Sequence, residues 1–68
     1  MQNFIYVQSE GGTKIAINVN SIVSVIKVSS DTSYIDYYSF DYEGSAPFRI
    51  DRITVRQSFD DIRNLIME

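Results

Sequence analysis

Cysteine, histidine and tryptophan are absent from this 68-residue chain. Without cysteine the chain forms no disulfide bond, and without histidine as well it lacks the ordinary ligands of zinc, copper and iron. The usual pairs of a nucleophile and a general base are missing for the same reason, so we expect no catalytic residue, no metal site and no cofactor. Paired carboxylates could still carry acid–base chemistry or bind a hard cation, but no calcium-loop motif is present.

Proline and leucine each occur once, whereas isoleucine and valine together number 16 and aromatic residues number nine. Branched and aromatic side chains favour the pleated surface of a sheet over a helix. No apolar run approaches the ~20 residues that span a bilayer. The N-terminus lacks the basic region of a signal peptide, and a chain without cysteine fits a reducing compartment. We therefore expect a mainly β protein of the cytoplasm.

The pattern predicts one domain over residues 1–68, mainly β (α+β), with a small antiparallel sheet and one C-terminal helix packed on a face. Four to five strands are expected, the first four at about residues 3–9, 13–18, 22–29 and 34–42, with a tight corner or single helical turn at 18–21. Ser58 is a good N-cap for the helix. The apolar stripe of that helix has helical spacing and consists of Phe59, Ile62, Leu65 and Ile66.

The last predicted strand contains a conflict of phase. Phe48 and Ile50 share one face of an extended chain, whereas Ile53 and Val55 share the other. A regular strand cannot point both pairs inward. We therefore expect a bulge near residues 51–52, or two short strands in place of one.

Several predicted strands are apolar on both faces, as in the first, where Ile5 and Val7 alternate with Phe4 and Tyr6. Both phases of the third strand are also apolar, one formed by Ile22, Ile26 and Val28 and the other by Val23 and Val25. A sheet with water on one side normally alternates apolar with polar residues. A domain of this size is marginally stable alone and has neither disulfides nor a metal as a staple. We therefore expect a homo-oligomer.

Five short segments carry a resemblance to known families, namely residues 5–7, the glycine turn at 11–12, residues 15–18, residues 22–25 and residues 53–62. Together they resemble the small FlbD-type proteins of bacterial flagellar operons and the β-rich core of LytTR-type DNA-binding domains. The resemblance implies an architecture, in which a strand pair with a glycine turn leads to a corner and a strand enters the final helix. Small β proteins of this shape also occur among phage and mobile-element products.

An acidic, tyrosine-rich stretch is the candidate partner-binding site. Tyrosine offers a large contact area with a polar tip and few rotatable bonds, which explains its enrichment at interfaces. The alternative is that these rings complete the domain core. The candidate residues are Tyr34, Asp36, Tyr37, Tyr38, Phe40, Asp41, Tyr42 and Glu43.

Three arginines near the helix start, Arg49, Arg52 and Arg56, form a candidate anion site, because guanidinium groups pair with phosphate in a bidentate manner. Pairing with neighbouring surface carboxylates is the simpler interpretation.

The leading functional hypothesis is a non-catalytic interaction module that binds a basic protein surface through the hairpin of the fourth strand. The alternatives are a phage or mobile-element inhibitor of a host system, a nucleotide or anion binder at a subunit interface, and a LytTR-like DNA-binding module. The net charge of −3 disfavours nucleic acid as a partner.

Overall fold

The described part of the chain, residues 3–40 and 48–68 of the computed structural model, contains five strands and one α-helix. The elements are β1 (Phe4–Gln8), β2 (Lys14–Asn18), the 3₁₀ helix η1 (Val19–Ser21), β3 (Ile22–Lys27), β4 (Ser33–Phe40), β5 (Phe48–Val55) and α1 (Phe59–Met67). This arrangement confirms the predicted mainly β, α+β fold, including the helical corner between the second and third strands. The predicted loop at residues 43–47 lies outside the described residues.

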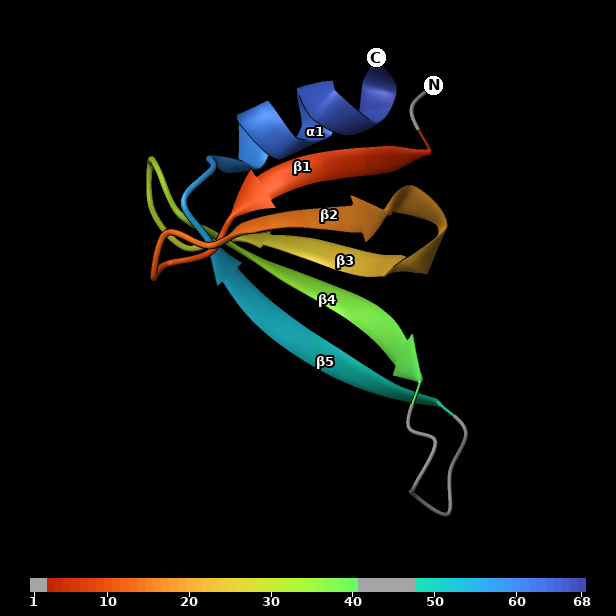
Figure 1. Cartoon of the computed structure of the whole chain (residues 1–68). Helices are drawn as coiled ribbons and strands as arrows, with labels where there is room; N and C mark the ends of the chain where they lie inside the picture. The colour runs from red at the N-terminus through yellow and green to blue at the C-terminus, as the bar shows by residue number, and fades with distance from the viewer. Residues whose placement is uncertain (1–2, 41–47) are drawn as a thin grey trace.

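The strands form two antiparallel sheets, β1–β2 and β3–β4–β5, whereas the sequence predicts one. Main-chain pairing joins the two sheets at one end, where Ser9 and Val55 form an isolated bridge. There the Arg56 amide donates to the Gln8 carbonyl at 2.9 Å, and the Glu10 amide donates to the Thr54 carbonyl at 3.1 Å. From this junction the strands fan out, and the β4–β5 hairpin reaches away from α1 (Figure 1).

The turn between β1 and β2 contains a backbone conformation that favours glycine. Gly12 has a φ of 93°, in the left-handed region that a side chain disfavours. The Gln8 side-chain amide donates to the Gly12 carbonyl at 3.1 Å, and the Arg56 guanidinium donates to the Glu10 carbonyl at 2.7 and 3.1 Å. The turn is thereby held against the end of β5.

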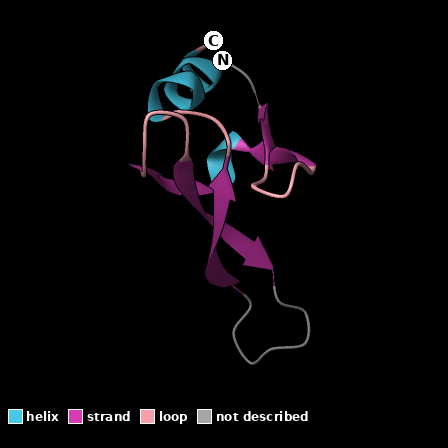
Figure 2. Ribbon diagram, turned by 90° about the vertical axis from the view of Figure 1, so that its left-hand side faces the viewer, coloured by secondary structure: helices cyan, strands magenta, loops and turns pink. Residues whose placement is uncertain are grey.

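The core lies between the two sheets and α1. Its buried side chains are Ile5, Val7, Ile17, Ile35, Val55 and Ile62. The helix contacts β1 and β3, and Figure 2 shows it at the opposite end of the described structure from where β4 ends and β5 begins. Each element therefore contributes one apolar stripe to a single core.

Ser58 caps α1 as predicted, with its hydroxyl accepting from the Asp61 amide at 3.1 Å. Ile62 is fully buried, and Leu65 and Ile66 pack against the core. The nine-residue length of α1 is too short for stability alone in water, so docking sustains it. Among the helices of residues 3–40 and 48–68, none has the length and apolarity needed to cross a membrane.

The prediction that Ile22 and Ile26 share one face of the third strand is wrong, because β3 contains an irregularity. Ile22 pairs with Tyr37 but Ser24 pairs with Asp36, so the register shifts between Ile22 and Ser24. As a result Ile22 and Val25 both pack against the core. The side chains left exposed are Val23, Ile26 and Val28.

The predicted interruption of the last strand is also wrong. β5 is continuous and pairs with β4 without a register shift from Phe48 to Val55. Only one of the two apolar faces of β5 is covered. Val55 is buried and Ile53 is half-buried, whereas Ile50 lies on the other face and is 57% exposed. The side chain of Phe48 lies outside the described residues.

Ser33 is fully buried, and its hydroxyl has no hydrogen-bond partner among the described residues. Replacing it with alanine removes a desolvated polar group, so we expect Ser33→Ala to raise the free energy of unfolding by about 1 kcal/mol. Urea unfolding measures this change. Ser24→Ala is the control, because the Ser24 hydroxyl donates to Asp36 and its loss should destabilise. A less stable Ser33→Ala variant would contradict the interpretation.

Candidate protein-binding surface

The face of the β3–β4–β5 sheet that points away from the core is only partly covered. Successive side chains of a strand alternate between faces, so residues in phase with Asp36 lie opposite the buried Ile35. The register places these residues in cross-strand rows. We call this surface the outer sheet face, and it consists of Ser24, Ile26, Tyr34, Asp36, Tyr38, Ile50, Arg52 and Thr54.

Three apolar side chains of the outer sheet face are exposed. Ile26 is 39% exposed, Tyr38 51% and Ile50 57%. Tyr38 and Ile50 are directly opposite each other on β4 and β5. Neither sits under the helix, because α1 contacts β1 and β3 on the core side. The β3–β4–β5 sheet therefore has apolar side chains on both of its faces, and those of the outer sheet face are not buried within a single copy of the chain.

A polar cluster sits in the middle of this apolar surface. Arg52 donates to both carboxylate oxygens of Asp36, at 2.7 and 3.1 Å, and the Ser24 hydroxyl donates to the same carboxylate at 3.2 Å. The guanidinium carbon of Arg52 is 4.8 Å from the centre of the Tyr34 ring, within the range of a cation–π contact. Only 15% of the Asp36 side chain is exposed, so a bidentate pair anchors the centre of the sheet face.

The charges of this cluster stabilise each other. Hydrogen bonds from Arg52, and to a lesser extent from Ser24, hold the pKa of Asp36 below its usual range. The same carboxylate raises the pKa of Arg52. Further along the hairpin, the Ser39 hydroxyl and Arg49 donate to Asp51 and lower its pKa.

These lowered pKa values predict acid sensitivity. A carboxyl group whose pKa is lower in the folded chain than in the unfolded chain contributes stability above the unfolded value of about 4, and loses it as pH falls through the folded value. We therefore expect the urea midpoint to drop below about pH 4. The drop should be smaller in Asp36→Asn, which cannot titrate at that position. An identical acid profile for the two chains would contradict the role given to this carboxylate.

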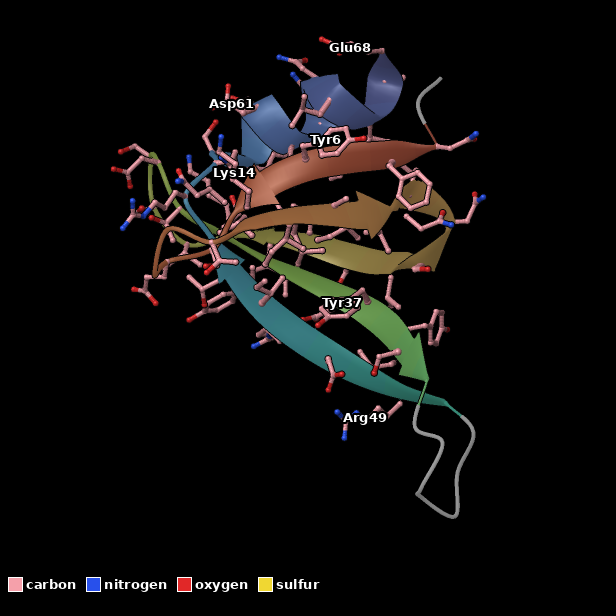
Figure 3. All side chains as sticks on the ribbon, viewed as in Figure 1. Tyr6, Lys14, Tyr37, Arg49, Asp61 and Glu68 are labelled. Atoms are coloured by element: carbon pink, nitrogen blue, oxygen red, sulfur yellow. The ribbon has the colours of Figure 1, made fainter. Side chains whose placement is uncertain are left out.

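The structure places the predicted partner-binding residues on both faces of β4. Tyr34, Asp36 and Tyr38 share the outer sheet face, whereas Tyr37 points to the opposite face and is half-buried. The position of Tyr37 on β4 can be followed in Figure 3. Phe40 belongs to β4, but its side chain lies outside the described residues, as do Asp41, Tyr42 and Glu43.

The three arginines of the predicted anion site have separate partners. Arg52 pairs with Asp36 on the outer sheet face, and Arg49 contacts Ser39 and Asp51 in the opposite phase of the hairpin. Arg56 lies beyond β5 and holds the β1–β2 turn through the Glu10 carbonyl. The structure thus does not gather them in one pocket, and nucleotide or anion binding by them stays a prediction. Among residues 3–40 and 48–68, no group of three or more acidic side chains is placed to hold a metal ion.

Sequence analysis missed one concave feature, a groove of about 340 Å³ between β2 and the β4–β5 hairpin. Residues 15–18 of β2 form one wall, and Tyr37, Tyr38 and Ile53 lie across from them. In Figure 3, the label of Tyr6 marks the β1–β2 pair and the label of Tyr37 marks β4. The alternation in residues 14–18 predicts a strand, but nothing local indicates that one of its edges is free.

Comparison of the chain with protein-family models, curated proteins and solved structures gives no match.

Proposed function

We propose that this protein is a non-catalytic interaction module that binds another protein through the outer sheet face. The observation that supports the proposal best is the exposure of Ile26, Tyr38 and Ile50 around a fixed ion pair. Apolar and tyrosine side chains that surround a positioned polar group are typical of the centre of a protein interface.

The charge around this surface favours a basic partner. Residues 34–43 include Asp36, Asp41 and Glu43 and contain no lysine or arginine. In the described part of the hairpin Arg52 pairs with Asp36 and Arg49 pairs with Asp51, so the negative excess in the hairpin's sequence comes from Asp41 and Glu43. We infer that the partner presents an apolar strip flanked by lysine or arginine, because opposite charges at the rim speed association and select orientation.

A capture experiment with matched variants tests this function. The chain is immobilised and exposed to an extract of the cells that produce it, and bound proteins are quantified by mass spectrometry. The double variant Ile26→Ser and Ile50→Ser removes apolar contact area from the outer sheet face. A specific partner should bind this variant at least about 100-fold more weakly, given roughly 1.5 kcal/mol or more for each isoleucine that is buried on binding.

The control is Tyr6→Ser, which removes an exposed aromatic side chain from the other sheet. Tyr6 is 73% exposed, so the control removes a larger exposed side chain than either isoleucine. Binding should survive this change and should weaken with increasing salt. Equal loss of the captured protein in both variants, or no specific protein at all, would reject the assignment of the binding surface.

A further inference from the structure

One edge of β2 has no strand beside it within the described residues. β2 pairs only with β1, in a two-stranded sheet. The hydrogen bonds at the two ends of this pair join Ser9 to Thr13 and Val19 to Asn3, at 2.8 and 2.9 Å. Odd-numbered residues of β2 therefore direct their main-chain groups toward β1. The main-chain groups of the even-numbered residues, Lys14, Ala16 and Asn18, point to the free edge.

The free edge borders the apolar groove rather than open solvent. Ile15, Ala16, Ile17 and Asn18 all line the groove, so it runs along the strand. A strand added to this edge would continue the β1–β2 sheet and would direct alternate side chains into the space in front of Ile53. Unpaired edges of this kind are the sites at which sheets accept another strand.

We propose that a second copy of this chain fills the edge with its own β2, running antiparallel, with the two-fold axis at Ala16. The sequence of β2, Lys-Ile-Ala-Ile-Asn, is suited to pairing with itself. About that axis Ala16 lies opposite the partner's Ala16, Ile15 opposite the partner's Ile17, and Lys14 opposite the partner's Asn18. A two-fold interface requires such self-complementarity, and here no like charges face each other.

The hydrogen-bonding groups also match the symmetry. With the axis at Ala16, the two Ala16 residues exchange both of their main-chain hydrogen bonds. Each Asn18 amide donates to the partner's Lys14 carbonyl, while the Asn18 side-chain oxygen still caps η1 by accepting from the Asn20 amide at 2.9 Å. Ile15 of the partner, which is half-buried in one copy, then adds to the apolar lining of the groove, whereas Ile17 of the partner stays in the partner's own core. Pairing of β2 with the partner's β2 would thus fill the free edge and cover the groove at the same time.

This dimer pairs the edges of β2, whereas the proposed partner-binding function uses the outer sheet face. Tyr38 lines the groove and also belongs to that face, so the variants that separate the two proposals leave Tyr38 unchanged. Sedimentation equilibrium across about 10 µM to 1 mM should give twice the monomer mass of 7.8 kDa at the upper end. Ala16→Pro removes an amide that the monomer does not use, and proline is tolerated on a free edge. We expect this variant to keep its circular dichroism spectrum and to dimerise at least tenfold more weakly.

Two charge variants sharpen the test, because both retain a good cap at residue 18. Asn18→Asp places a carboxylate opposite the partner's Lys14 and should tighten the dimer about fivefold, even though each chain becomes more acidic. Adding Lys14→Glu to Asn18→Asp places two acids opposite each other and should weaken it by a similar factor.

A monomer at every concentration would overturn the proposal. A dimer that is insensitive to Ala16→Pro and to the charge variants would also overturn it, by assigning self-association to another face. The Ile26→Ser and Ile50→Ser variant should dimerise normally, and Ala16→Pro should still capture the protein partner. These crossed results separate failure of the dimer from failure of the proposed function.

Discussion

Replacing Ile35 with alanine is expected to lower the free energy of unfolding by about 2 to 5 kcal/mol. Ile35 is fully buried at the centre of β4, the middle strand of its sheet, and lies in one row with Val25 and Ile53. Truncation removes apolar contacts and leaves a cavity that fixed strands on both sides cannot close. A domain of this length has a total stability of roughly 3 to 10 kcal/mol, so much of the population should unfold.

Equilibrium urea unfolding, followed by circular dichroism, measures this loss. Ile50→Ala is the matched control, because it truncates the same side chain on the neighbouring strand at a position that is 57% exposed. We expect that control to change stability by no more than about 0.5 kcal/mol in a monomeric sample. Equal losses for the two variants would mean that the core lies elsewhere than between the two sheets.

Replacing Ile62 with aspartate is expected to detach α1 and to cost more than about 3 kcal/mol, from lost apolar burial together with desolvation of a charge. Ile62 is the one residue of α1 that is fully buried. A nine-residue helix that loses its docking contact does not persist in water. The far-ultraviolet spectrum should therefore lose its helical component.

Hydrogen exchange separates local from global effects in this variant. Amides of α1 should lose protection first, followed by those of β1 and β3, which the helix contacts. Asn64→Asp is the control, because it adds the same charge at an exposed position of the same helix. Retained protection of α1 in Ile62→Asp would contradict the docking that the fold assigns to this side chain.

Local signals located the elements because they act over a few residues. The Ser58 cap, the glycine turn, the corner after Asn18 and the apolar spacing of the helix each depend on neighbours in sequence. The first four predicted strands agree with the observed ones to within two residues at each described end. Alternation in residues 34–38 likewise placed Tyr34, Asp36 and Tyr38 on one face, which the register confirms.

The candidate binding surface was only partly predictable, because it depends on which face of each strand is covered. The tyrosine-rich stretch was selected from the sequence, but the pairing of Asp36 with Arg52 joins residues 16 apart and follows from the β4–β5 register. Ile26 and Ile50 become exposed through the shifted register of β3 and the unbroken course of β5. Neither feature leaves a trace in local periodicity.

The sequence by itself determined a small chain of β-branched strands, closed by one capped helix, without the side chains for disulfides, ordinary transition-metal sites or common nucleophilic catalysis. Only the tertiary structure decided that, within residues 3–40 and 48–68, five strands divide into two sheets, the outer sheet face is left exposed, and one edge of β2 is unpaired beside a groove. The physical reason is the distance along the sequence over which each effect acts. Propensity and periodicity act between near neighbours, whereas burial of a face and pairing of an edge depend on segments far apart in the chain.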